Sequence, residues 1–369
     1  MNNFWFKIKH PILALAPMAG ITDSAFRQIC RRYGADVVYS EMASVSALYF
    51  HPVKYFSFTK NNFVDQNLLN RVKPQKTLEL VKFEKAERPY IVQLFGKDPA
   101  HFAKATKIIS EKVKPDGIDI NFGCPAKKVF GHGSGCALMM QKELAREIIS
   151  AVCENTNLPV SIKIRAGVKD ATALEFVRYT ADLPYSAIMI HGRTYEGGFS
   201  GPLDFKLVEK IKKMFPEKIV LANGGINSAE DGVKILKDHP LLDGLGIARG
   251  AWGRPWIFEE IKDLLSCAET RHCLVSTTAN YDFKKIHLVK YFSITKNNFA
   301  EQNLLNRVKK IMLLHAKLIH KDKGQHGLFE IRKHMSWYVK GFPGASELRR
   351  KLVLAESVEE IKEILNQNH

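Results

Sequence analysis

The stretch "DGIDINFGCPAKKV", Asp116–Val129, shows the pattern on which the fold of this chain depends. Apolar and polar residues alternate through Ile118–Asn121, as in a strand, and the alternation stops at Phe122–Pro125. A cysteine between a glycine and a proline, with two lysines just beyond, therefore stands where a strand ends. From the residues alone, Cys124 could be a metal ligand, half of a disulfide, a nucleophile, a proton donor or a small core residue.

The same kind of strand recurs along the chain, separated by helical patterns such as Phe102–Val113 and Leu144–Val152. Strands that alternate with helices predict parallel pairing and an α/β fold. Eight such units in about 250 residues predict a (β/α)8 TIM barrel, in which functional residues lie at the C-terminal ends of the strands. The alternative is an open doubly wound sheet, but no G-x-G-x-x-G follows the first strand. The predicted strands are Ile12–Ala16, Asp36–Met42, Tyr90–Gly96, Gly117–Gly123, Pro159–Arg165, Ala187–Arg193, Lys218–Gly225 and Asp243–Gly250.

Polar residues and glycines gather where the predicted strands end. One polar strand end is chance, whereas eight in register indicate a common site. The strand ends are Ala16–Gly20, Glu41–Met42, Gln93–Gly96, Asn121–Cys124, Lys163–Arg165, His191–Arg193, Asn223–Gly225 and Ala248–Gly250.

Composition narrows the roles of the protein. With 369 residues, 46% hydrophobic and 25% charged, the chain has the composition of an ordinary soluble protein. No apolar run approaches the length of a membrane span, and charges fall inside the apolar opening Phe4–Ala19, so we expect a cytoplasmic protein without a signal peptide. The six cysteines are scattered without a C-x-x-C pair, which makes disulfides improbable and leaves no zinc spacing. Two of the roles open to Cys124 are thereby set aside.

The formal net charge of +17 favours a polyanionic partner, because basic side chains that neutralise phosphates release counterions. Alternatively, the positive charge reflects a lysine-rich proteome and indicates no partner. We expect a monomer that binds no metal.

The alternation of strands and helices stops after Arg254–Phe258, and the rest of the chain has helical patterns. Ile311, Leu314 and Leu318 form one apolar stripe, and Ser357 with Glu360 matches a capping box before the last helix. We therefore expect three segments, namely a catalytic barrel at 1–265, a linker at 266–309 and a small all-helical domain at 310–369.

A long internal repeat is also present. "HPVKYFSFTKNNFVDQNLLNRVK" at 51–73 recurs at 287–309 with 19 of 23 positions identical. Solenoids and propellers need several copies at short period, so a duplicated insertion explains the repeat better than a shared function does. We expect both copies to be surface segments, partly helical, without chemistry.

Two glycine-containing strand ends suit a phosphate. In barrels the loops after strands seven and eight often hold a phosphate on backbone N–H groups, and Asn223–Gly225 and Ala248–Gly250 lie at these points. Glycine allows close backbone approach, and Arg249 could add charge. Alternatively, the two segments are only tight turns that bind no phosphate. Flavin mononucleotide (FMN) has one terminal phosphate and therefore fits this arrangement.

Three further strand ends could hold the flavin ring. The small residues of Pro17–Ala19 could lie against its face, and the amide of Gln93 could bond its pyrimidine edge. Lys163 would place a positive charge beside the ring, which favours the reduced anionic form. Each residue alone could be structural, whereas together they favour a flavin.

Several motifs together resemble the tRNA-dihydrouridine synthases, most closely the bacterial B-type branch. They are "APMAGITDSAFR", "VQLFGKDP", "DINFGCPAKKV", "SIKIRAG", "IHGRT", "LANGGI", "ARGAWGRPWIF" and "RKHMSWYVKG", and they cover nearly the whole chain outside the repeat copies and part of the linker. The resemblance implies an FMN-binding barrel followed by a helical tRNA-binding domain. It also implies reduction of the C5=C6 bond of specific tRNA uridines to 5,6-dihydrouridine, with NADPH as the reductant.

The resemblance assigns residues by position in the motifs. Cys124 matches the catalytic proton donor. Cofactor-binding positions are matched by Pro17, Met18, Ala19, Gln93, Lys163, His191, Asn223, Gly224, Gly225, Ala248 and Arg249. Asn121, Arg165, His191 and Arg193 match positions that line the flavin and uracil site. Apart from the resemblance, other cations are candidates for substrate binding through RNA phosphates, namely Lys127, Lys128, Arg193, Arg332, Lys333, His334, Lys340 and Arg349.

Two positions depart from the family pattern. Ala248 stands where the family commonly has glycine, and its methyl group is tolerable only if the residue avoids positive φ. The segment "FGHGSGCALM" after the lysines is richer in glycine than the family pattern.

The implied reaction explains the cysteine. Hydride passes from flavin N5 to C6 of uracil, and the charge that develops is quenched by a proton from Cys124 to C5. A thiol with an ordinary pKa near 8.5 is mostly protonated at neutral pH and can act as a general acid. Nearby cations would lower that pKa, so we expect Lys127, Lys128 and Arg165 to point toward RNA phosphate rather than toward the sulfur.

Two other functions remain open. A flavin barrel could act on a free small molecule, as dihydropyrimidine or dihydroorotate enzymes do, although the basic C-terminal segment and the lack of an iron–sulfur cysteine cluster argue against this. A non-catalytic RNA-binding protein could retain the barrel, although Cys124, Lys163 and His191 argue against that.

Overall fold

The structure is a computed structural model that describes residues 3–50, 74–269 and 298–367. The chain divides into two compact units. The first comprises Met1–Asp23, Ala35–Ile226 and Lys234–Ala248, and the second comprises Ser24–Gly34, Asn227–Val233 and Arg249–His369. Within the described ranges, no helix is long and apolar enough to cross a membrane.

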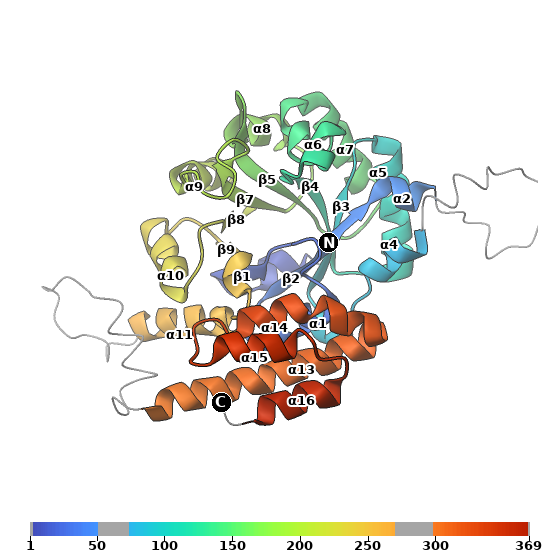
Figure 1. Cartoon of the computed structure of the whole chain (residues 1–369). Helices are drawn as coiled ribbons and strands as arrows, with labels where there is room; N and C mark the ends of the chain where they lie inside the picture. Colours follow the sequence, from blue (N-terminus) through green and yellow to red (C-terminus); the bar gives the residue numbers. More distant parts are fainter. Residues whose placement is uncertain (1–2, 51–73, 270–297, 368–369) are drawn as a thin grey trace, which may run out of the picture. The chain divides into compact units, whose positions relative to one another are not determined.

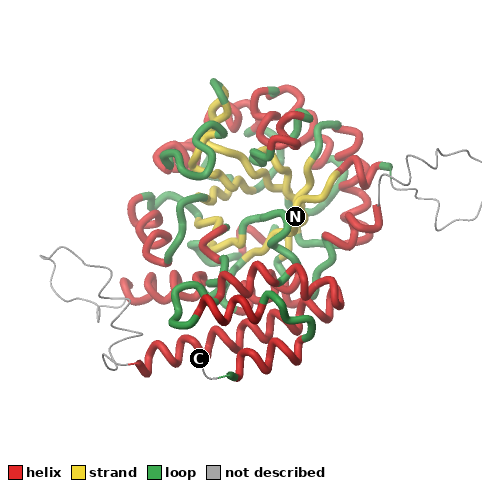
Figure 2. Tube along the Cα trace, in the orientation of Figure 1, coloured by secondary structure: helices red, strands yellow, loops and turns green. Residues whose placement is uncertain are grey.

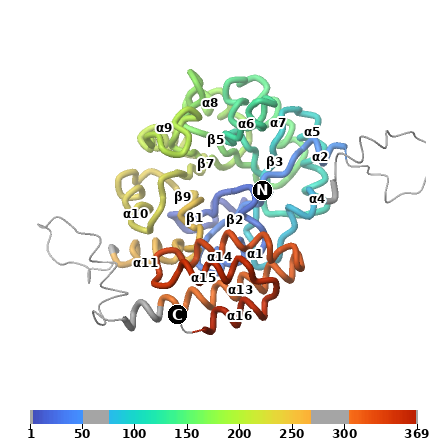
Figure 3. Tube along the Cα trace, viewed as in Figure 1, coloured from blue at the N-terminus to red at the C-terminus, as the bar shows by residue number. Residues whose placement is uncertain are grey.

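The first unit is a closed barrel of eight parallel strands. Each strand pairs with its neighbours in chain order, and the pairings β4–β5 and β1–β9 close the ring. Figure 1 shows the strands surrounded by helices, and in Figure 3 the colours advance in sequence around the ring. The predicted (β/α)8 TIM barrel is confirmed. Its strands are β1 (Ile12–Leu15), β2 (Val37–Ser44), β3 (Tyr90–Phe95), β4 (Gly117–Phe122), β5 (Val160–Val168), β7 (Ala187–Thr194), β8 (Ile219–Asn223) and β9 (Gly244–Ile247).

All eight predicted strands are present, with ends that shift by a few residues. A two-residue strand, β6 (Ala171–Thr172), pairs antiparallel with the end of β5. Alternate residues of each strand face the barrel interior, and the register shifts at two places, between Tyr39 and Met42 in β2 and between Arg165 and Gly167 in β5.

The interior changes character along the strands. Toward the N-terminal ends it is apolar, and Trp5 from the short helix η1 (Phe4–Lys7) packs into it. A polar layer follows along β3, β4 and β5, beginning with the register partners Gln93, Asp119 and Ser161 and continuing toward the C-terminal ends. The apolar cluster consists of Trp5, Ile12, Ala14, Ala16, Val37, Tyr39, Ile91, Ala187, Met189, Ile219 and Leu221. The barrel therefore has a packed apolar end and a polar end.

The helices of the barrel unit start at recognisable signals. Asp98 caps the helix that begins with Pro99, and Thr172 with Glu175 forms a capping box. In the tube view the helices form an outer layer around the strands (Figure 2). The helices are α2 (Val45–Tyr49), α4 (Pro74–Leu80), α5 (Pro99–Ile108), α6 (Lys127–Gly131), α7 (Lys142–Cys153), α8 (Ala173–Thr180), α9 (Phe205–Met214) and α10 (Ala229–Asp238), the last of which begins in the second unit.

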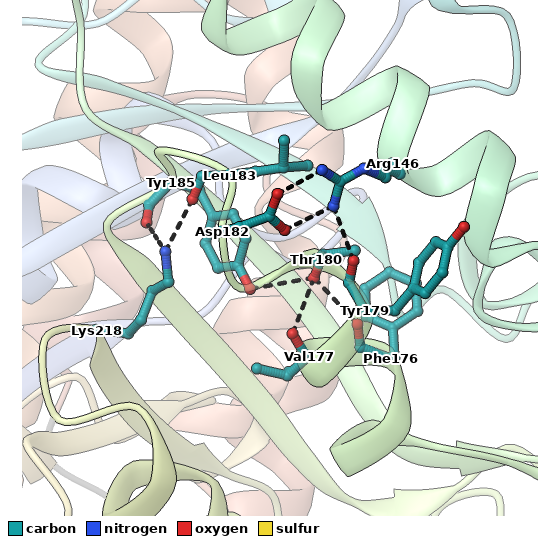
Figure 4. Close-up of polar contacts among 9 residues, drawn as sticks. All are labelled: Arg146, Phe176, Val177, Tyr179, Thr180, Asp182, Leu183, Tyr185 and Lys218. Carbon is teal, nitrogen blue, oxygen red and sulfur yellow. Dashed lines mark hydrogen bonds and ion pairs between the residues drawn. The ribbon is translucent and has the colours of Figure 1, made fainter.

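Lys218, just before β8, is a buried structural cation. Its Nζ donates 2.9 Å hydrogen bonds to the carbonyls of Leu183 and Tyr185 and lies 4.0 Å from the centre of the Tyr185 ring (Figure 4). In the same region Arg146 of α7 pairs with Asp182. Burial lowers the pKa of Lys218. These contacts join α7, the end of α8 and the start of β8 at the N-terminal side of the strands.

The second unit is helical. Its core includes Ala25 and Ile29 of α1, Trp256, and residues of the four C-terminal helices. The predicted stripe lies in or against this core, with Ile311 buried and Leu314 and Leu318 packed beside it. Ser357 caps the last helix by accepting the Glu360 N–H at 3.0 Å, as predicted. The helices are α1 (Ser24–Arg32), α11 (Ile257–Glu269), α13 (Asn298–Glu330), α14 (Arg332–Tyr338), α15 (Ala345–Leu352) and α16 (Val358–Asn366).

The second repeat copy runs into α13. This helix begins at Asn298, and Leu305 and Val308 are buried, with Val308 in the helical core. Arg307 pairs with Glu259 and lies over the rings of Tyr33 and Trp256. The expectation of a surface segment is therefore wrong for 304–309, because a helix that supplies apolar residues to a core must bury that face. The first copy, 51–73, and residues 287–297 lie outside the described residues.

Candidate active site

Strand register brings the predicted site residues together at the C-terminal ends of the barrel strands. Asn121 of β4 is opposite Lys163 of β5, and Arg165 of β5 is opposite His191 of β7. His191 is in turn opposite Asn223 of β8. Because neighbouring strands lie about 4.8 Å apart, these side chains form one contiguous set. Distant segments of the sequence thus meet at one end of one barrel.

The segment after β1 is held as a tight turn. The carbonyl of Met18 accepts hydrogen bonds from the N–H groups of Ile21 and Thr22 and from the Thr22 hydroxyl. Glu41, buried within β2, accepts the N–H of Gly20. Pro17 and Met18 are partly buried, and Ala19 is exposed. The segment predicted to face the flavin therefore has a fixed backbone.

Asn121 holds the start of the cysteine loop. Its Oδ1 accepts the N–H of Gly123 at 3.1 Å and that of Cys124 at 2.9 Å, which is an Asx-type turn. Gly123 allows the loop to pass close to β5, because a Cβ there would lie 3.3 Å from the Lys163 carbonyl oxygen. The Cys124 side chain is partly buried.

The glycine-rich segment after the lysines closes against Cys124 from the other side. Cys136 donates its thiol to the Cys124 carbonyl at 3.0 Å, and its N–H reaches the same oxygen at 3.3 Å. Gly135, with φ of +63°, lies so close that a Cβ would come within 2.9 Å of that oxygen. Burial raises the pKa of Cys136 to about 12, so this thiol stays protonated. The extra glycine in this segment has a structural reason.

A cation lies at the centre of the strand ends. Lys163 Nζ donates to Asn223 Oδ1 at 3.1 Å, and Asn223 Nδ2 donates to the Gly246 carbonyl at 2.6 Å. Burial, followed by the neighbouring Arg165 guanidinium, lowers the pKa of Lys163 to about 8. Lys163 is therefore mostly charged at neutral pH. Its ammonium would stabilise a negative charge placed beside it.

The turn after β8 requires glycine twice. Gly224 has φ of +102° and Gly225 has φ of +71°, both in the left-handed region. A Cβ on Gly224 would overlap the His191 ring, and one on Gly225 would overlap Leu203. Such a turn leaves its backbone accessible for close approach by an anion. Ala248 is partly buried and lies outside the positive-φ region, which satisfies the condition set by its departure from glycine.

Arg165 does not point toward RNA phosphate as expected. It is 2% exposed, and its guanidinium donates to the carbonyls of Gly123, Thr194 and Gly198 at 3.0 to 3.1 Å. That part of the expectation is wrong, because three carbonyl groups compensate the burial of the charge inside the barrel end.

The other predicted cations of the barrel behave differently. Lys127 and Lys128, at the start of α6, are exposed. Arg193 is partly buried and donates from Nε to the Gly201 carbonyl at 2.6 Å. The exposed lysines are therefore free of the barrel core and available to a polyanion.

In the helical unit the predicted cations also divide. Arg249, at the start of η6 (Arg249–Ala251), is exposed, and Lys333 is partly buried. Arg332 lies over the half-exposed ring of Phe329, at 4.6 Å. His334 is fully buried against Phe26 and His315, and burial holds its pKa well below the ordinary value, so it is not a phosphate contact.

Three residues that support the site were given no role of their own from the sequence, namely Asp119, Glu41 and Gly135. Asp119 and Glu41 each had a signal, since a carboxylate in a buried strand is rarely unpaired. Gly135 lies in the glycine-rich segment noted from the sequence, but its contact with Cys124, eleven positions away, is present only in the folded loop.

The whole chain can be compared with known proteins. The model of the "Dihydrouridine synthase (Dus)" family matches residues 14–369. The chain belongs to the dihydrouridine synthase family. Membership, predicted from the motifs, is thereby confirmed.

Curated relatives agree with this assignment. The "tRNA-dihydrouridine synthase B" of Pseudomonas aeruginosa is 33% identical, over 91% of this chain and 86% of its own. The "Probable tRNA-dihydrouridine synthase" of Mycobacterium leprae is 31% identical, over 95% of this chain and 86% of its own. Among solved structures, histamine dehydrogenase from Rhizobium sp. 4-9 aligns with a TM-score of 0.46 at 15% identity, covering 68% of this chain and 45% of that one.

Proposed function

We propose that this dihydrouridine synthase is FMN-dependent and reduces the C5=C6 bond of specific tRNA uridines, with NADPH as electron donor. The observation that carries the proposal is the register of the strand ends, where Lys163, Asn223 and the Cys124 loop lie at the same end of the barrel. tRNA is the substrate in the names of the relatives, and the net charge of +17 suits it.

The residues present fit FMN. Gly224 and Gly225 offer a backbone turn without side chains, which suits a terminal phosphate. Lys163 supplies a positive charge, and the Gln93 amide retains one N–H and one lone pair beyond its internal bonds. Pro17–Ala19, His191, Ala248 and Arg249 complete the proposed cofactor-binding set. When bound, the flavin would supply the hydride for uridine reduction.

Cys124 is the proposed proton donor. It is partly buried, and its backbone is fixed by Asn121 on one side and Cys136 on the other. A thiol held in one place can deliver a proton to C5 without reorganisation of the loop. Asn121, Arg165 and Arg193 are proposed to line the substrate site, with Lys127 and Lys128 contacting phosphates.

The helical unit is proposed to bind tRNA through its cations, with the partly buried Arg332 and Lys333 as contacts. A target uracil is stacked in folded RNA, so it has to leave the stack before it meets a barrel-bound cofactor. Recognition of the RNA would then rest on shape and backbone phosphates.

One experiment tests the function. The purified protein is examined for bound yellow flavin, incubated with NADPH and unmodified tRNA, and the nucleosides are analysed for dihydrouridine. Cys124→Ala is expected to bind FMN and to oxidise NADPH but to lose dihydrouridine formation by about 100-fold or more. Flavin bleaching without dihydrouridine from the wild type would instead support a small-molecule oxidoreductase, and a colourless RNA-binding protein would contradict both.

A further inference from the structure

Asp119 is a fully buried carboxylate in the middle of β4 that the proposed reaction does not use. Its two oxygens accept hydrogen bonds from Ser161 Oγ at 2.6 Å and from Gln93 Nε2 at 2.8 Å. The groups that face it are Tyr39 from β2, Gln93 from β3, and Ser161 and Lys163 from β5. Burying a carboxylate costs free energy unless hydrogen bonds compensate it, and these partners supply that compensation.

From Asp119 a chain of hydrogen bonds runs to the cysteine loop. Gln93 donates to Asp119, and its Oε1 accepts from Asn121 Nδ2 at 2.9 Å. Asn121 Oδ1 then accepts the N–H groups of Gly123 and Cys124. Every link is between 2.8 and 3.1 Å, and the links cross from β4 to β3 and back to the end of β4.

The direction of the chain is set at both ends, because a carboxylate only accepts and the backbone N–H groups of Gly123 and Cys124 only donate. Each amide side chain carries a donor at one end and an acceptor at the other, so either amide could be turned around. An ionised carboxylate only accepts, so Asp119 requires the NH2 end of Gln93. That choice leaves the oxygen of Gln93 facing Asn121, which must offer its own NH2 group. The oxygen of Asn121 therefore faces the two backbone N–H groups, as it must to hold the loop.

We propose that Asp119 is a positioning residue, which orients the amides of Gln93 and Asn121 and thereby fixes the backbone of Cys124. Its effect on proton donation rests on the proposed function, whereas its effect on the loop does not. Without an acceptor at 119, Gln93 loses the partner of its NH2 group, and Asn121 loses a fixed acceptor for its own NH2 group. Asn121 is then held only by the N–H groups of Gly123 and Cys124, and the loop loses one of the two anchors of the chain.

Two variants separate orientation from charge. Asp119→Leu keeps the approximate size of the side chain but removes the acceptor. Asp119→Asn removes the charge but retains an oxygen for the Gln93 N–H, while its NH2 group can face the Ser161 hydroxyl, which can accept. The inference predicts a defect in Asp119→Leu that Asp119→Asn largely rescues.

The first measurement is hydrogen–deuterium exchange of the peptide that contains Gly123 and Cys124, followed by mass spectrometry. In Asp119→Leu exchange at these amides is expected to be about tenfold faster or more, and in Asp119→Asn close to the wild-type rate. Lys218→Met is the matched control, because it removes a buried charge that bonds two carbonyls at the other end of the strands. It is expected to lower stability without changing exchange at Cys124.

The second measurement is the kinetics of uridine reduction with FMN-loaded protein. Asp119→Leu is expected to lower kcat by about 10- to 100-fold with little change in KM for tRNA. Equal exchange and equal kcat in wild type, Asp119→Leu and Asp119→Asn would overturn the inference. Should Asp119→Leu fail to fold, Asp119→Ser replaces it, since the shorter hydroxyl cannot span to Gln93.

The exchange and kinetic measurements distinguish a failure of the proposed function from a failure of the role given to Asp119. A wild type that forms no dihydrouridine contradicts the proposed function, and the exchange measurement still decides the role of Asp119. A loop defect without a kinetic defect overturns the link between Asp119 and catalysis.

Discussion

Lys163 donates a 3.1 Å hydrogen bond to Asn223 although their strands, β5 and β8, are not neighbours. The bond passes across the barrel interior beside β7, which lies between them. It therefore fixes the cation with respect to the turn at Gly224 and Gly225, which follows Asn223 directly. The ring-binding and phosphate-binding parts of the proposed FMN site are joined by this contact.

The lowered pKa of Lys163 predicts a pH dependence. With a pKa of about 8, the ammonium is charged below that pH and is lost above it. A bound flavin that gains negative charge favours the ammonium, so we expect the rate of flavin reduction by NADPH to be constant near pH 7 and to decline as the pH rises above about 8. In Lys163→Arg the guanidinium stays charged, and the decline should vanish from this range. Stopped-flow reduction across this range checks both profiles, and identical declines would contradict the assignment.

Gly224→Ala is predicted to impair FMN retention. The substitution places a side chain at φ of +102° and against the His191 ring, and strain of this kind costs about 1 to 3 kcal/mol. FMN affinity, measured by fluorescence quenching of the apoprotein, is expected to fall about tenfold or more. Gly131→Ala is the control, because nothing lies within 4 Å of its Cβ and its φ is negative. Equal affinity of the two variants would exclude a role of the turn in binding.

Gly135→Ala is predicted to displace Cys124. Its new methyl group would meet the Cys124 carbonyl oxygen at 2.9 Å and Cβ at 3.1 Å. Gly133→Ala shares the positive φ, at +75° against +63°, but meets only Lys97 at 3.7 Å. Dihydrouridine formation should therefore fall about tenfold further in Gly135→Ala than in Gly133→Ala, with equal FMN affinity in both. Similar losses in both would point to backbone strain instead of the contact.

Asp119 predicts how stability depends on pH. Burial raises its pKa from 3.8 to about 6, despite hydrogen bonds from Ser161 and Gln93 that act in the opposite direction. Between about pH 4 and pH 6 the folded protein keeps a proton that the unfolded chain has lost, so this group makes the free energy of unfolding fall as pH rises, by about 3 kcal/mol in all. Relative to Asp119→Asn, the wild type should lose stability across this window in urea denaturation. Parallel curves for the two proteins would show that the carboxyl titrates normally.

The fold could be predicted because its signals are local. All eight strands have alternating or β-branched patterns and end in glycine or polar residues, and their alternation with helices requires parallel pairing. The positions of Gln93, Lys163 and Asn223 follow directly, because the C-terminal ends of parallel strands meet at one end of a barrel.

The remaining features depend on contacts that no local pattern records. The carbonyl partners of Arg165 come from two loops, and a motif shows only that an arginine is present. His334 lies two positions after the partly exposed Arg332, and its burial depends on how α14 rotates against α1 and α13. Val308 belongs to the second copy of the repeat, which was expected to lie at the surface, yet it is buried in the core of the helical unit.

Arg165 has a consequence for the interpretation of mutants. One guanidinium anchors the carbonyl of Gly123, just before Cys124, and two carbonyls of the 194–198 segment, so the two backbones cannot be displaced independently. Loss of this side chain would loosen both at once. A mutational scan that ranks residues by lost turnover would place Arg165 beside Cys124, the proposed proton donor, although Arg165 acts by holding two backbone segments together.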